Sequence, residues 1–190
     1  NGLLVGTEHE KFVIDNLSKK VVPYEGSNGI KALLTGMKRF GFEPVLEGET
    51  LIGLTRGRES ISLEPAGQYE LSGAPLTHLH DMSEELDRHI FESTEIANEL
   101  GLSFMPIGYH PTASVDELPW MPKGRYKIMR EYMPKVGTRG LEMMQLTCTT
   151  QANLDFTDEN DMARKMRVSL ALQPVVSALF ANSPFAKGKL

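Results

Sequence analysis

Residues 3–14, LLVGTEHEKFVI, place polar residues in the middle of an otherwise apolar stretch. Successive side chains of a β-strand point to opposite faces, so this stretch predicts a strand with Glu8 and Glu10 on one face. The two carboxylates repel each other, and a bound cation would relieve that repulsion. Hard oxygen donors favour Mg²⁺ or Mn²⁺ over zinc. The alternative is a solvated strand face with Lys11 as counter-ion.

A second acidic segment, ISLEPAGQYELSG at residues 61–73, strengthens the cation hypothesis. A strand formed by its second half and paired beside the first would bring Glu70 close to the first two glutamates. Glu64 and Gln68 are weaker candidates for the same site. Glu64 alternatively just precedes a turn, and Gln68 alternatively pairs with backbone groups.

The region around these segments predicts an antiparallel meander. Residues 42–72 contain short strand patterns separated by turns at Gly48, Gly57 and Gly67. Strands grouped in this way, without regular βαβ alternation, predict an α+β fold.

Helical patterns flank the meander. Apolar spacing predicts helices over residues 27–40, 77–100 and 157–182, the last with a kink at Pro174. Ser27 and Asn28 are expected to cap the first helix, Thr77 to open the second and Thr157 to cap the third. The apolar stripe expected on the second helix consists of Leu79, Met82, Leu86, Ile90, Ala97 and Leu100.

Residues 147–156 predict a third polar strand. Its amides, Gln151 and Asn153, are suited to ligate a metal through oxygen or to bind a nucleotide or an amino acid. The alternating apolar residues are expected to anchor the strand in the core. Cys148 belongs to that apolar face, which predicts a buried structural thiol and no nucleophile.

The segment 103–140 is rich in proline and glycine and predicts a long irregular, functional region. Its basic residues are suited to neutralise polyphosphate or to bind a carboxylate, and a solvated basic surface is the alternative. They are Lys123, Arg125, Lys127, Arg130, Lys135 and Arg139. No GxxxxGK[ST] motif occurs, so no P-loop is predicted.

Composition narrows the class of protein. A net charge of -5 argues against a nucleic-acid partner. No apolar run approaches the roughly 20 residues that span a bilayer, so no membrane partner is expected. One cysteine fits a reducing compartment. We therefore expect a cytoplasmic protein, or a plastid protein if a transit peptide has been removed.

Five stretches occur together, in the same order as in one known family: GTEHEKF, SISLEPAGQYELSGAPL, MPKGRYKIMREYMPKVG, LTCTTQANLDF and ALQPVVSALFANSPF. In these stretches the chain resembles glutamate–cysteine ligases of the plant and proteobacterial type. The resemblance implies a curved antiparallel sheet with helices packed outside, as in the catalytic domain of glutamine synthetase. It also implies that residues 1–190 are the N-terminal portion of one catalytic domain that continues beyond Leu190.

The resemblance implies a reaction as well. ATP phosphorylates the side-chain carboxylate of glutamate, and the amine of cysteine attacks the γ-glutamyl phosphate to give γ-glutamylcysteine, the precursor of glutathione. Mg²⁺ or Mn²⁺ is the implied cofactor, and ATP is a co-substrate. The alternatives are a related carboxylate–amine ligase with another amine and a noncatalytic binding domain. We expect residues 1–190 alone to be inactive.

Site residues implied by the resemblance fall into three groups, none acting as nucleophile, acid or base. The metal ligands are Glu8, Glu10 and Glu70, with Glu64 and Gln68 as weaker candidates. The residues near ATP and metal are Gln151 and Asn153. The weaker substrate-binding candidates are Tyr132, Val136 and Thr147 for cysteine and Arg125, Arg130 and Arg139 for anions.

Overall fold

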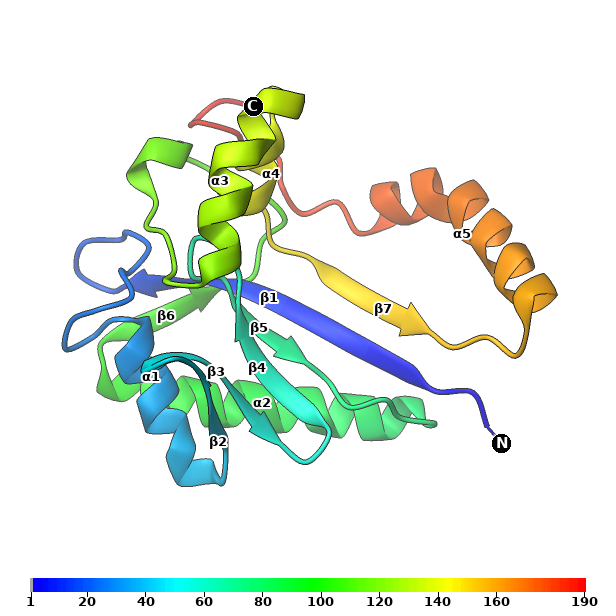
Figure 1. Cartoon of the computed structure of the whole chain (residues 1–190), viewed down its shortest axis with the longest axis horizontal. Helices are drawn as coiled ribbons and strands as arrows, with labels where there is room; N and C mark the ends of the chain where they lie inside the picture. Colours follow the sequence, from blue (N-terminus) through cyan, green and yellow to red (C-terminus); the bar gives the residue numbers. More distant parts are fainter. Residues whose placement is uncertain (1) are drawn as a thin grey trace.

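An antiparallel sheet of seven strands, ordered β2-β3-β4-β5-β1-β6 with β7 also paired to β1, forms the centre of the protein (Figure 1). The computed structural model describes residues 2–190. The strands are β1 (Val5–Asp15), β2 (Glu43–Glu47), β3 (Thr50–Arg56), β4 (Glu59–Leu63), β5 (Tyr69–Ser72), β6 (Leu102–Met105) and β7 (Thr150–Leu154). The predicted α+β class, with its antiparallel meander over β2 to β5, is confirmed.

Strand β1 is the longest strand and changes partners along its length. Its first half lies between β5 and β7, with Glu8 opposite both Ser72 and Gln151. Its second half pairs with β6. The turns of the meander contain Gly48, Gly57 and Gly67 with positive φ angles of 61°, 60° and 84°, a region that glycine enters without a steric penalty.

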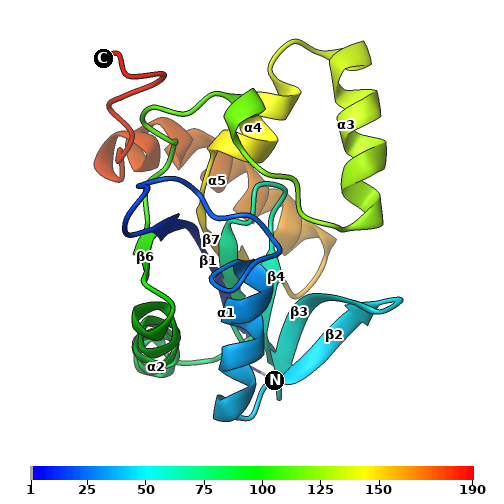
Figure 2. The same ribbon diagram turned by 90° about the vertical axis from the view of Figure 1, so that its left-hand side faces the viewer.

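The helices are α1 (Ile30–Met37), α2 (Leu79–Glu99), α3 (Gly124–Val136), α4 (Gly140–Leu146) and α5 (Glu159–Leu179), with short 3₁₀ turns η1 (Lys38–Phe40) and η2 (Val115–Glu117). Helices α1 and α2 pack beside each other on one side of the sheet (Figure 2). Helix α5 lies beyond β7 and is exposed over most of its length (Figure 1). No helix within the described residues is long and apolar enough to cross a membrane.

The predicted helix starts were wrong by a few residues. Helix α1 follows Gly29, and the amide of Asn28 donates instead to Asp15 at 2.9 Å. Helix α2 begins at Leu79. Helix α5 is capped by Asp158, whose side chain accepts from the backbone N–H of Asp161. A carboxylate one residue after the predicted cap therefore satisfies one N–H group of the first turn.

The apolar stripe predicted for α2 was only partly right, since Ala97 is buried and Leu100 packs against the core but two other members are exposed. Leu79 and Ile90 are 79 % and 47 % exposed. The buried face instead contains Glu85, His89, Glu92, Ser93, Ile96 and Ala97. This face is polar because the strands beneath it carry charged side chains, which must find partners once they are buried.

The Pro- and Gly-rich segment 103–140 is more regular than predicted, since it contains part of β6, η2 and α3. Helix α3 is fixed at its start, where the Tyr126 hydroxyl and the Lys123 ammonium both donate to the Leu63 carbonyl. Pro134 lies in the last turn of the helix, where it has no N–H to donate to the Arg130 carbonyl, and the helix ends two residues later at Val136.

The third polar strand is shorter than predicted, and its apolar residues Leu154 and Phe156 are exposed, so they do not anchor it in the core. Pairing with β1 holds β7 instead. Cys148 is buried, as predicted, and burial raises the pKa of its thiol.

Candidate functional site

The predicted polar strands meet on one face of the sheet. Glu10 of β1 lies directly opposite Glu70 of β5, and Glu8 lies opposite Gln151 of β7. Side chains directly opposite each other in an antiparallel pair have Cβ atoms about 5 Å apart. The structure therefore brings three carboxylates and the amides of β7 onto one surface, which is the side of the sheet away from α2.

Side chains from and beside β7 hold the two glutamates of β1. Asn153 donates from Nδ2 to Glu8 Oε1 at 2.9 Å, and Gln151 donates to Asn153 Oδ1 at 2.8 Å. Glu10 accepts from the backbone N–H and the hydroxyl of Thr149, at 2.8 and 3.0 Å. Thr149 was not among the predicted site residues, although it alternates with Gln151 and Asn153 on the same polar face.

The other two acidic candidates lie next to this pair and are held by different partners. Ser72 donates its hydroxyl to Glu70 Oε1 at 2.6 Å. Glu64, just past the end of β4, forms an ion pair with Arg125 at 3.3 Å. Each carboxylate of the site thus has its own hydrogen-bonding partner.

Crowding of these carboxylates affects the pKa values of Glu10 and Glu64. Burial raises the pKa of Glu10, bonds from Thr149 oppose the shift, and the charges of Glu70 and Glu8 add to it. The pKa of Glu64 rises to about 7, mainly through burial and then through the charge of Glu70. A cation bound among them would lower both values, since it favours the charged form of each acid.

The donor set fits Mg²⁺ in a particular way. Within residues 2–190, no three His, Cys, Asp or Glu side chains are arranged to hold a metal ion. Mg²⁺ is usually bound by one or two protein carboxylates, together with waters and substrate phosphates. Pairs such as Glu10 and Glu70 fit that coordination, whereas a cage made only of protein ligands does not.

Gln68 has a different place from the one predicted for a metal ligand. Its side chain is buried, its oxygen accepts from the Ala66 N–H, and its amide nitrogen donates to the carbonyls of Met144 and Thr147. These bonds join the start of β5 to the end of α4. The contacts match the alternative role of pairing with backbone.

The substrate-binding candidates are not all brought to the carboxylates. Of these candidates, Arg125 alone contacts a carboxylate of the site, namely that of Glu64. Tyr132 and Val136 are exposed on α3, and the Thr147 hydroxyl donates to the Met143 carbonyl. Arg130 lies over the ring of Trp120, and Arg139 pairs with Glu142.

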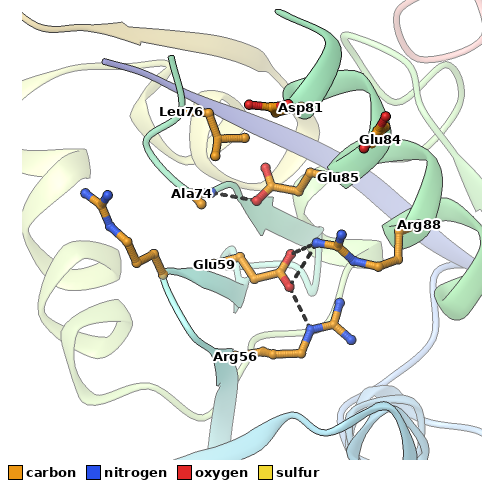
Figure 3. Close-up of a pocket in the computed structure, with 9 residues that line it drawn as sticks. Arg56, Glu59, Ala74, Leu76, Asp81, Glu84, Glu85 and Arg88 are labelled. Carbon is orange, nitrogen blue, oxygen red and sulfur yellow. Dashed lines mark hydrogen bonds and ion pairs between the residues drawn. The ribbon is translucent and has the colours of Figure 1, made fainter. Parts of the chain in front are cut away.

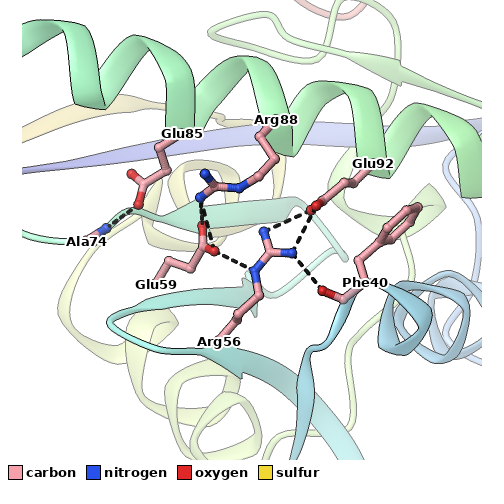
Figure 4. A network of polar contacts seen from close by, with 7 residues as sticks. All are labelled: Phe40, Arg56, Glu59, Ala74, Glu85, Arg88 and Glu92. Atoms are coloured by element: carbon pink, nitrogen blue, oxygen red, sulfur yellow. Dashed lines mark hydrogen bonds and ion pairs between the residues drawn. The ribbon is translucent and has the colours of Figure 1, made fainter.

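A hollow of about 350 Å³ lies on the opposite side of the sheet, between the β3–β4 hairpin and α2 (Figure 3). Three charged residues that line it, Arg56, Glu59 and Arg88, are already in ion pairs. Arg56 binds Glu92 through two hydrogen bonds of 2.9 Å and Glu59 through one of 2.7 Å (Figure 4). Arg88 also binds Glu59. We therefore assign the hollow to the packing of α2 and place the candidate site on the carboxylate face.

The fold and the site define an α+β protein whose sheet presents a carboxylate-lined face suited to a divalent cation. Residues 4–190 match the sequence profile of Glutamate-cysteine ligase family 2, and the chain belongs to this family. The family resemblance seen in the sequence is confirmed.

Curated relatives share about half of their aligned residues with this chain. A chloroplastic glutamate–cysteine ligase of Arabidopsis thaliana is 53% identical over 186 residues, which cover 97% of this chain and 35% of the relative. One of Medicago truncatula is 52% identical, with 97% and 36% covered. Chloroplastic glutamate–cysteine ligase A of Oryza sativa subsp. japonica is 49% identical, with 97% and 37% covered. The chain thus spans about a third of the length of these relatives.

Proposed function

We propose that this chain forms the N-terminal strands of a ligase that joins glutamate and cysteine into γ-glutamylcysteine with consumption of ATP. The observation that supports this proposal most is the pairing of Glu10 with Glu70, beside Glu8, on one sheet face of a chain of this family. We propose a γ-glutamyl phosphate as the intermediate. The relatives are named as glutamate–cysteine ligases.

Pairs among Glu8, Glu10 and Glu70 would hold Mg²⁺ or Mn²⁺ together with the ATP phosphates, and Glu64 is a further candidate. A bound divalent cation supplies positive charge that offsets the negative charge of the transferring phosphoryl group. The residues of this chain orient the ligands. Asn153 fixes Glu8 and Thr149 fixes Glu10. Their carboxylates therefore stay on the side of the sheet away from α2, which we call the open face. Preorganised ligands of this kind need little rearrangement during the reaction.

Arg125 is the basic residue best placed to contact an anion at this site. It is exposed, and its guanidinium already reaches Glu64. An arginine so placed can form two parallel hydrogen bonds with a phosphate or with a substrate carboxylate. The cysteine pocket remains a proposal for Tyr132, Val136 and Thr147, and anion contacts remain proposals for Arg130 and Arg139.

The relatives are named as chloroplastic proteins. We propose a plastid location for the full-length protein on this basis, and the cytoplasmic location stays an untested prediction. The substrates of this chemistry are small molecules, so the proposed partners are glutamate, cysteine and ATP.

Product analysis with the full-length protein tests the proposal. Glutamate, Mg²⁺–ATP and a panel of amines are supplied, and the γ-glutamyl products are identified by mass spectrometry. Preference for cysteine supports the proposal, and preference for another amine supports a related carboxylate–amine ligase instead. A noncatalytic domain would give no product. Such a domain would either fail to bind Mg²⁺–ATP or bind it equally well after Glu8→Gln and Glu10→Gln. Residues 1–190 alone are expected to give no product.

A further inference from the structure

Lys11 lies on the same strand as Glu8 and Glu10, with its side chain on the opposite face of the sheet. Its side chain packs beneath α2, and the residue is only 6 % exposed. The ammonium contacts His89 Nε2 at 2.9 Å and the His9 carbonyl at 3.3 Å. It also lies 5.5 Å from the centre of the Tyr69 ring and 5.8 Å from that of Phe104. The ammonium is therefore enclosed by rings and one carbonyl.

Within residues 2–190, Lys11 makes no ion pair with a carboxylate. An unpaired charge in such a place costs several kcal/mol of solvation. Two cation–π contacts recover only about 1 to 4 kcal/mol. A nearby negative charge would lower this cost further.

His89 does not supply that charge. It is 1 % exposed, and burial and the positive charge of Lys11 keep its pKa well below the usual value. The ring is neutral, so Nε2 accepts from the ammonium and the proton is on Nδ1. Nδ1 has no hydrogen-bonding partner. His89 thus fixes the position of Lys11 without neutralising it.

Two acidic residues of the candidate site lie next to Lys11 in the sheet ladder. Lys11 is paired with Tyr69, and the adjacent pair in the same ladder is Glu10 with Glu70. Neighbouring residues of a strand are separated by only about 3.3 Å along it. Burial lowers the pKa of Lys11 to about 8, and the thiol of Cys148 and then the charge of Glu70 oppose that shift.

We propose that Lys11 is a positioning residue of the carboxylate site. His89 holds its ammonium on the closed face, which is the side of the sheet covered by α2. From there the ammonium acts as a fixed counter-charge to Glu10 and Glu70 on the open face, and it weakens their binding of a divalent cation. A weakened site lets the cation enter and leave together with the nucleotide. This inference rests on the metal-binding role proposed above.

Binding of Mn²⁺ to the full-length ligase, followed by electron paramagnetic resonance near pH 7, tests the inference without an activity measurement. Lys11→Met and Lys11→Gln each remove the charge, so that one serves if the other fails to fold. Both are expected to bind Mn²⁺ about three- to tenfold more tightly than the wild type. Lys11→Arg keeps the charge and is expected to bind as the wild type does.

Lys31→Met is the matched control, because it removes one positive charge at an exposed residue that pairs with Glu25 on the surface. Its Mn²⁺ affinity should not change. Unchanged or weaker Mn²⁺ binding in the folded neutral Lys11 variants would overturn the inference. If Glu10→Gln binds Mn²⁺ as the wild type does, the metal assignment itself fails, and this inference fails with it.

Discussion

Both faces of β1 are polar, but they differ in how their polar groups are held. On the open face, Glu8 and Glu10 accept hydrogen bonds from Asn153 and Thr149, which are themselves exposed. On the closed face, Lys11 is enclosed by α2, as is Arg56 on β3. Buried charges are costly to leave unpaired, whereas exposed ones exchange partners readily. The closed face is thus committed to the fold, and the open face is free to bind a ligand.

The largest effect is expected from Arg56→Met on the closed face. The substitution leaves the buried carboxylates of Glu59 and Glu92 without their main partner. We expect a loss of about 3 to 5 kcal/mol of stability, measured by urea unfolding of the full-length protein. Arg39→Met, which breaks an exposed pair with Glu99, should cost at most about 1 kcal/mol. Equal losses would contradict the contrast between the faces.

Glu10→Gln on the open face should leave stability nearly unchanged and lower turnover instead. The amide keeps the size of the side chain and can still accept from Thr149, so the unfolding curve should hardly move. Turnover should fall roughly 100-fold or more, because charge on a ligand of the transferring phosphoryl group is lost. Steady-state kinetics at saturating Mg²⁺ check this, and normal turnover there would remove Glu10 from the ligand set.

Gly73→Ala tests where the two faces meet, at the end of β5. A Cβ atom there would clash with Glu85 Oε2 and lie 3.1 Å from the Thr7 carbonyl. Overpacking of this kind costs about 1 to 3 kcal/mol. Adding Glu85→Ala makes room, so the double variant should lose less stability than the sum of the single variants. Strict additivity in urea unfolding would show that the contact is not the cause.

The smallest effect concerns pH. The pKa of Glu64 is about 7 in the folded chain, above its ordinary value of 4.5. The folded state therefore holds this proton more tightly, and stability falls as pH rises from about 4.5 to 7, by an amount on the order of 1 kcal/mol after solvent screening. Glu64→Gln should remove that slope. Unfolding of both proteins with EDTA present measures it, and parallel pH profiles would argue against the shift.

Much of the carboxylate face was predictable, because alternation along a strand depends only on backbone geometry. The pattern at residues 3–14 placed Glu8 and Glu10 together, and the turns at Gly57 and Gly67 predicted the meander that carries Glu70. Whether these residues bind metal is a separate prediction that the fold leaves open.

The closed face was not predictable in the same way. Hydrophobic spacing identified the extent of α2 but chose Leu79 and Ile90 for its buried side, where Glu85 and His89 lie instead. Periodicity treats every charged residue as exposed, and it does not include the partners that the sheet supplies from far away in the sequence. Lys11 and His89, 78 residues apart, are such a pair.

The position of β1 between β5 and β7 also determines the order in which the chain can assemble. The meander needs only neighbouring segments, whereas the first half of β1 cannot pair on its other side until residues 150–154 exist. At a synthesis rate of about 5 to 20 residues per second, that edge stays open for roughly 7 to 30 s on the ribosome. An open strand edge pairs readily with other chains, so the nascent protein is most exposed to aggregation during this interval.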